Sequence, residues 1–170
     1  YDPCLDECFY AWKGGGAYLN GQSLQVSSVR SMEASFVVTE LPYNSEQYAR
    51  TGEYLIRELY GRVAGIRMNG SAAIALCYVA AGRFDAWLEA FLGKWDFSAA
   101  ALIVQEAGGR VTDFYGNAGF IDGHHVVATN GWLHPFLLEL VQKAIFFIYS
   151  FPGSALCAAS LCRREKMLFA

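Results

Sequence analysis

The sequence predicts a layered α/β domain, and three observations lead to that class. Apolar, β-branched segments alternate along the chain with segments of helical periodicity, which is the pattern of a sheet covered by helices. The length of 170 residues suits one domain with a substantial core. Hydrophobic residues make up 54% and charged residues 17% of the chain, which excludes disorder as its main state.

Charge and cysteine content narrow the class of partner and compartment. The formal net charge is −3, so we do not expect a nucleic-acid partner. Five cysteines without a secretory signal argue against a disulfide framework, and the spacing of Cys4 with Cys8 and of Cys157 with Cys162 is loose for zinc. We expect free thiols and a cytoplasmic protein. Because the chain starts at Tyr1 without Met, we also expect it to be a fragment that lacks upstream residues.

A hairpin is the first predicted unit. Residues 17–19 and 22–26 flank Asn20-Gly21, a pair that favours a type I′ turn because both positions need positive φ. The glycines at 14–16 lack the Lys-Ser/Thr that follows a phosphate loop. They therefore indicate the start of a strand with close backbone approach.

The following segments predict the alternation of strands and helices. Expected strands are 34–41, 63–67, 84–89, 110–114 and 125–129, and expected helices are 45–60, 72–81, 97–106 and 132–144. Asn44 or Ser45 can cap the first helix. Its apolar face comprises Tyr48, Leu55, Ile56 and Leu59. The helix at 72–81 is apolar all round and should be buried.

Histidines do not form an obvious site. The adjacent His124 and His125 should point to opposite faces of their strand, which argues against a two-histidine metal site. His134 is expected to be exposed in the first turn of the last helix. No histidine is spaced to activate a serine or cysteine, so the sequence names no catalytic residue.

The end of the chain differs from the rest. Residues 144–162 carry no charge and are followed by a charged cluster at 163–166, a pattern that can mark a membrane span. Pro152 and Gly153 interrupt the segment, so we expect a divergent apolar tail at 144–170 after a domain at 1–143. A membrane anchor remains the alternative, although we do not expect a membrane partner.

Two helix starts and one strand end carry the candidate chemistry. Ser71 and Asp96 lie where helix N–H groups are unpaired and attract anions. Asp96 either caps its helix or directs its carboxylate at a hard cation such as Mg²⁺. Glu89 lies just past a strand end, where α/β sheets bind ligands, and taken alone is interpreted as a solvated carboxylate. Gly70 permits a tight strand-to-helix turn.

These segments resemble the inositol monophosphatase family. The likeness runs from Tyr1 to about Leu138 and rests on the order and spacing of four blocks. They are Arg67-Met68-Asn69-Gly70-Ser71-Ala72-Ala73, Val79-Ala80-Ala81-Gly82-Arg83-Phe84-Asp85, Trp95-Asp96-Phe97-Ser98-Ala99-Ala100 and Glu106-Ala107-Gly108-Gly109. The resemblance implies the carboxy-terminal portion of a sugar-phosphatase-like fold, a layered sandwich of helices and mixed sheets.

The resemblance also implies an activity and a site. The activity is Mg²⁺-dependent hydrolysis of inositol phosphate or a related small phosphate ester, such as a nucleotide 3′-phosphate, a sugar bisphosphate or histidinol phosphate. Asp96 would bind the metal and lie near the substrate hydroxyls, and Glu89 would contact the ring. Gly70, Ser71 and Ala72 would line the substrate pocket.

The sequence departs from the family in its metal ligands. The family takes further ligands from an upstream Glu and an Asp-Pro-x-Asp-Gly-Thr/Ser segment, which this sequence lacks. Asp2 and Asp6 mimic that segment, but Glu7 replaces its Gly and the residues belong to the hairpin block. We therefore expect the chain alone to be inactive or nearly so. A non-catalytic remnant that binds a partner or a full-length phosphatase is the alternative, and a homodimer of the full-length form is left open.

Overall fold

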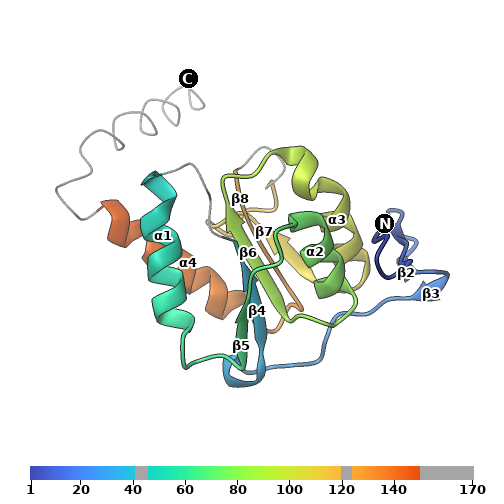
Figure 1. Cartoon of the computed structure of the whole chain (residues 1–170), viewed down its shortest axis with the longest axis horizontal. Helices are drawn as coiled ribbons and strands as arrows, with labels where there is room; N and C mark the ends of the chain where they lie inside the picture. The colour runs from blue at the N-terminus through green and yellow to red at the C-terminus, as the bar shows by residue number, and fades with distance from the viewer. Residues whose placement is uncertain (41–45, 120–123, 150–170) are drawn as a thin grey trace.

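The computed structural model describes residues 1–40, 46–119 and 124–149 (Figure 1). Its elements in chain order are β1 (Phe9–Ala11), β2 (Ala17–Leu19), β3 (Gln22–Ser23), η1 (Met32–Ala34), β4 (Phe36–Thr39), α1 (Glu46–Leu59), β5 (Gly65–Arg67), α2 (Ala72–Ala80), β6 (Ala86–Ala90), α3 (Lys94–Glu106), β7 (Arg110–Thr112), β8 (His125–Thr129) and α4 (His134–Tyr149). The expected layered α/β fold is confirmed.

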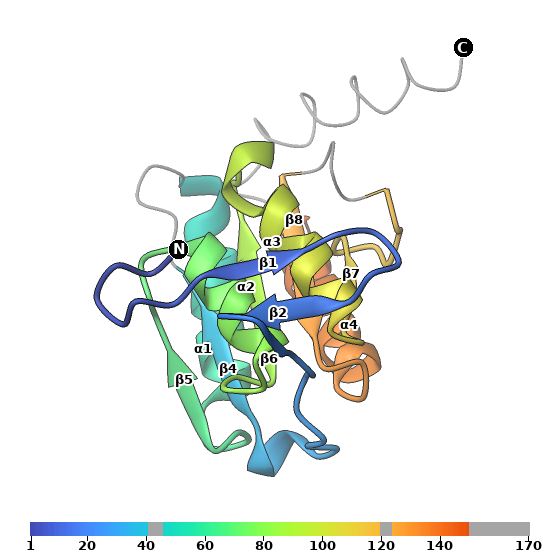
Figure 2. The ribbon, with the colours of Figure 1, turned by 90° about the vertical axis from the view of Figure 1, so that its right-hand side faces the viewer.

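Four layers follow one another through the molecule. Figure 1 shows α1 and α4 on one side of a five-stranded sheet and α2 and α3 on the other. A small sheet of β1, β2 and β3 covers the outer side of α2 and α3, where Figure 2 shows β1 and β2 lying across the helices. Each helix pair is thus packed against the large sheet.

The large sheet is mixed, as expected, and has the order β5-β4-β6-β8-β7. β4 runs parallel to β5 and β6, whereas β8 runs antiparallel to β6 and β7. Successive residues of the central strand β6 serve opposite faces. Trp87 belongs to the core beneath α2 and α3, and Leu88 belongs to the core beneath α1 and α4. Both side chains are fully buried.

The predicted hairpin forms, although its second strand comprises only Gln22–Ser23 and not the expected residues 22–26, and the hairpin is bonded to α3. Asn20 and Gly21 have φ of 49° and 84°, as a type I′ turn requires. The glycine loop before β2 does approach other backbone and side-chain groups closely. Its Gly14 and Gly16 N–H groups donate to the Glu106 carboxylate at 2.8 and 3.0 Å. The loop therefore encloses an anion that the protein itself supplies.

Several boundaries differ from the expectations. β1 and η1 were not foreseen, and α3 begins at Lys94 instead of Phe97 because the extended Gly93 serves as its N-cap. The buried Leu55 and Leu59 confirm the inward face of α1. The proposed caps Asn44 and Ser45, and the side chain of Tyr48, fall outside the described part.

The expected exposure of His134 is wrong. Its ring is fully buried against β7 and β8, with Nε2 2.9 Å from Thr112 Oγ1 and Nδ1 3.1 Å from Thr129 Oγ1. His134 is buried although it lies in the first turn of α4, because this helix begins against the ends of β7 and β8. Two threonine hydroxyls satisfy the ring and make the buried position tolerable.

The carboxyl-terminal region is described only in part. α4 continues across the expected boundary between 143 and 144 as far as Tyr149, and Ala144 is fully buried. The remaining tail at 150–170, with Cys157 and Cys162, lies outside the described residues. Within the described ranges, none of the helices has the length and apolar character needed to span a membrane. Cys4, Cys8 and Cys77 are free thiols.

Candidate functional site

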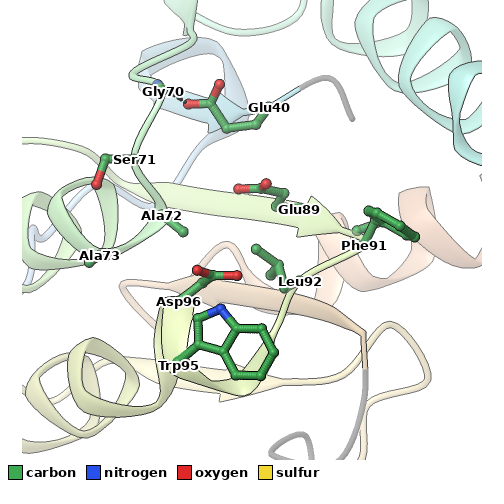
Figure 3. A pocket seen from close by; sticks show the side chains of 11 residues that line it. Glu40, Gly70, Ser71, Ala72, Ala73, Glu89, Phe91, Leu92, Trp95 and Asp96 are labelled. Atoms are coloured by element: carbon green, nitrogen blue, oxygen red, sulfur yellow. Dashed lines mark hydrogen bonds between the residues drawn. The ribbon is translucent and has the colours of Figure 1, made fainter. Parts of the chain in front are cut away.

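A cavity of about 480 Å³ opens where β4 and β6 end and α2 and α3 begin (Figure 3). It brings together all the residues that the sequence nominated for the site: Gly70, Ser71, Ala72, Glu89 and Asp96. Trp95 and Phe91 also line it, and both are largely exposed to solvent. The cavity thus combines an open mouth with polar groups from four elements.

The wall at α2 is made of backbone. Gly70 has a φ of 73°, which lets the chain turn from β5 into the helix with little strain. Ser71 is the N-cap, as predicted, and its Oγ accepts a long hydrogen bond of 3.5 Å from the Ile74 N–H. The positive end of the α2 dipole therefore faces the cavity at Ser71 and Ala72.

Asp96 caps α3 from inside its first turn. Its Oδ2 accepts a hydrogen bond from the Gly93 N–H at 2.9 Å, and its own N–H donates to the Gly93 carbonyl. The predicted capping role is confirmed. Among the described residues Oδ1 has no hydrogen-bond partner, and the carboxylate faces Glu89 in Figure 3. One oxygen thus fixes the side chain and the other is left for a ligand.

Glu89 is more enclosed than the sequence suggested. It is the fourth residue of β6, is only partly accessible, and its buried Oε2 accepts no hydrogen bond from the described part of the chain. Burial, followed by the negative charges of Glu40 and Asp96, raises the pKa of Glu89 to about 7. The interpretation as a solvated carboxylate is therefore wrong.

Glu40 is the site residue that the sequence analysis missed. It directly follows β4, and its Oε1 accepts hydrogen bonds from the Asn69 and Gly70 N–H groups at 2.5 and 2.8 Å. The parallel register that pairs Thr39 with Leu88 brings Glu40 beside Glu89. A carboxylate at the end of each of two buried strands was the available indication, because parallel strands end at one edge.

The donor set fits a hard cation only in part. Carboxylate oxygens such as Asp96 Oδ1 and Glu89 Oε2 are the ligands that Mg²⁺ prefers. Within the described ranges, however, no three or more Asp, Glu, His or Cys side chains are grouped so that they could hold a metal ion. Asp2 and Asp6 do not line the cavity. Asp2 accepts a hydrogen bond from the Tyr78 hydroxyl, and Asp6 accepts one from the Tyr1 hydroxyl.

Comparison with known proteins settles the family. Residues 1–145 match the profile of the inositol monophosphatase family. The chain belongs to the inositol monophosphatase family. Its resemblance to that family, expected from the four sequence blocks, is therefore confirmed, and the matched segment includes every residue of the cavity. Metal-dependent phosphatase chemistry is the general property of the family.

Curated proteins with similar sequences are named either as a Nus factor or as an inositol monophosphatase. The chain is 45% identical over 143 residues to the Nus factor SuhB of Pseudomonas aeruginosa, which covers 83% of this chain and 53% of that protein. It is 37% identical over 147 residues to the inositol-1-monophosphatase of Rhizobium meliloti, covering 85% and 54%. The chain spans about half the length of the curated relatives it matches.

Solved structures of the inositol monophosphatase family share the fold. The extragenic suppressor protein SuhB from Bartonella henselae superposes with a TM-score of 0.80 at 36% identity, covering 84% of this chain and 56% of that one. The IMPase of Thermotoga maritima gives 0.78 at 33% identity, covering 86% and 55%. The layered arrangement seen here is thus the arrangement of the corresponding half of these proteins.

Proposed function

We propose that this protein acts as a Mg²⁺-dependent phosphomonoesterase on inositol phosphate or a related small phosphate ester. The observation that carries the proposal is one cavity in which Glu89 Oε2 and Asp96 Oδ1 lack partners among the described residues. The name of the Rhizobium meliloti relative supports the substrate class. Free thiols at Cys4, Cys8 and Cys77 suit a reducing compartment, and we include a cytoplasmic location in the proposal.

In this proposal some residues of the cavity bind the metal ion, and others bind the alcohol part of the phosphate ester. Asp96 would hold the Mg²⁺, which when bound neutralises phosphate charge and acidifies a water. The Asp96 side chain needs no reordering to do so, because its bond to Gly93 fixes it. Glu89 would accept hydrogen bonds from the substrate hydroxyls. Gly70, Ser71 and Ala72 would line the substrate pocket, and the α2 start would offer the backbone N–H groups of Ser71 and Ala72 to the substrate, because the Gly70 N–H is already bonded to Glu40.

The 170-residue chain by itself should release phosphate slowly or not at all. Asp96 supplies one free carboxylate oxygen to the cavity, whereas Mg²⁺ needs near-octahedral coordination to hold a phosphate in place. We propose that the remaining ligands come from residues outside this chain. A homodimer of the longer form remains part of the proposal.

Phosphate release is the test of the proposed function. The protein purified from its native source should hydrolyse inositol monophosphate only with Mg²⁺, and Asp96→Asn should abolish the reaction. Asp6→Asn is the matched control, because Asp6 is exposed, lies outside the cavity and has a φ of 52° that Asn tolerates. Undiminished release by the Asp96→Asn protein, or release in the presence of a chelator, would refute the proposal.

The intact mass decides how the isolated chain should behave. A native mass well above 18.8 kDa would show that the native protein contains further residues, which could supply the remaining metal ligands. Mg²⁺-dependent release by the 170-residue chain, lost on Asp96→Asn, would overturn the expected inactivity.

A second candidate is a protein that binds a partner without catalysis. The Pseudomonas aeruginosa relative, the more similar of the two curated relatives mentioned above, is named as a Nus factor, not by a reaction. Native protein that hydrolyses no phosphate ester, yet sediments as a larger complex, would favour this candidate over the first.

A further inference from the structure

The cavity has an unusual charge balance. Its described lining contains the carboxylates of Glu40, Glu89 and Asp96 and no lysine, arginine or histidine. Metal binding at Asp96 would account for one of these charges. It would leave Glu40 and Glu89 side by side at the ends of β4 and β6, without a protein cation in the described lining.

Glu40 is held in place by backbone groups, not by a charge partner. Both hydrogen bonds to it come from the turn before α2, at Asn69 and Gly70, and both reach Oε1. Oε2 has no partner among the described residues, and Figure 3 shows the Glu40 and Glu89 side chains on the same side of the cavity. The turn thus fixes an anionic group in the lining of the cavity.

The pair favours a cationic ligand over a neutral one. Hydroxyl groups can donate hydrogen bonds to both carboxylates, but they leave the two negative charges uncompensated. An ammonium or imidazolium group also donates hydrogen bonds to both carboxylates, and in addition its positive charge compensates their negative charge. This compensation contributes most to the binding free energy where water is partly excluded.

We propose that Glu40 is a specificity-determining residue which, together with Glu89, selects phosphate esters whose alcohol carries an ammonium or imidazolium group. The inference rests on the proposed phosphomonoesterase function and narrows its substrate class. It assigns Glu40 no role in the chemical step. Glu40 contributes a fixed charge, and the Asn69-Gly70 turn keeps that charge in position.

Binding of the free alcohols tests the selection without requiring catalysis. Calorimetry on the full 170-residue chain would compare histidinol, which is cationic, with myo-inositol, a neutral cyclic polyol. Histidinol should bind at least about tenfold more tightly, the equivalent of about 1.4 kcal/mol. Glu40→Gln should remove about tenfold of the histidinol affinity and change the inositol affinity less than about twofold.

The variants separate charge from structure. The amide side chain introduced by Glu40→Gln would keep an oxygen that can accept both N–H bonds, so that the turn is retained while the charge is lost. The control is Glu33→Gln, the same change at an exposed site before the opposite end of β4. Independently of any variant, raising the salt concentration should weaken histidinol binding and leave inositol binding unchanged.

Each outcome bears on one claim. The proposed selection of cationic alcohols is overturned if inositol binds as tightly as histidinol or more tightly. It is also overturned if Glu40→Gln leaves the preference for histidinol unchanged, or if neither alcohol binds. None of these results removes the proposed function, which is tested separately by the Mg²⁺ dependence of phosphate release from the native protein and by the loss of that release in Asp96→Asn. Native protein that hydrolyses inositol phosphate faster than histidinol phosphate would refute the inference alone.

Discussion

The carboxylate of Glu106 accepts a hydrogen bond of 2.8 Å from the backbone N–H of Gly14, 92 positions earlier in the chain. A second bond, from Gly16, reaches the other oxygen. Glu106 is the last residue of α3, so these bonds attach the amino-terminal hairpin to the centre of the molecule. They also lower the pKa of Glu106.

Glu106→Ala should therefore loosen the hairpin. Amide hydrogen exchange at Gly14 and Gly16 should accelerate, while exchange within β6 should not change. In the wild type this stabilisation is present above the unfolded pKa and disappears as the pH falls through the lower folded value. Glu139→Ala, an exposed change on α4, is the control. Unchanged exchange at both glycines would contradict the tether.

Protonation of His134 should destabilise the protein. Burial, with a smaller contribution from Arg110, lowers the pKa of His134 to about 4. Since an unfolded histidine titrates near 6.5, the unfolded state binds more protons between about pH 4 and pH 6.5. The free energy of unfolding should decrease as the pH falls through that window, and His134→Gln should flatten this slope.

Glu89 titrates in the same window with the opposite sign, so the His134 measurement belongs in a Glu89→Gln background. Urea denaturation at half-unit pH steps would provide the slopes. Burial also lowers the pKa of His125, so this histidine contributes to the slope with the same sign, and His134→Gln should reduce the slope without abolishing it. A slope that is unchanged by His134→Gln would contradict the contribution of His134.

Glu89→Gln should stabilise the protein at alkaline pH. Burial raises the pKa of Glu89 to about 7, so the folded state binds more protons than the unfolded state between about pH 4.5 and pH 7. Stability due to this group therefore falls as the pH rises through the window. After allowance for solvent screening, the gain at about pH 8 should be about 1 kcal/mol. Equal stabilities of the two proteins at that pH would contradict the burial of this charge.

The two adjacent glycines after α3 should respond differently to substitution. A Cβ on Gly109 would lie 2.6 Å from Val104 Cγ1 and 2.7 Å from the Thr129 carbonyl oxygen. Gly109→Ala should therefore cost about 1–3 kcal/mol of unfolding free energy. Gly108 has open space around it but a φ of 87°, so Gly108→Asn should cost less than about 1 kcal/mol. Urea denaturation would rank them, and the reverse order would be incompatible with this packing.

Local patterns were sufficient to predict most elements but not their tertiary neighbours. Asn20-Gly21 specifies its turn through its own backbone, and Ser71 caps the helix that follows it, so both were predictable. The burial of His134 depends on Thr112 and Thr129, which no local period connects to it. Its exposure was therefore predicted wrongly.

The site divides in the same way. Family blocks identified Gly70, Ser71, Ala72, Glu89 and Asp96, and the cavity contains all of them. Glu40 is not among the residues predicted from the sequence, because its place in the site depends on the strand order. In that order β4 and β6 are neighbours, although β5 lies between them in the chain. Sequence spacing alone does not reveal that adjacency.

The central position of β6 has a consequence for synthesis on the ribosome. β6 pairs with β4, which is already made when it emerges, but its other neighbour, β8, follows only after α3 and β7. Until then the nascent chain presents an open, apolar strand edge beside Trp87 and Leu88, a surface that invites pairing with other chains. Rapid docking of α2 and α3 onto that face would shorten the period of exposure, so variants that slow their docking should aggregate during translation before they lose native stability.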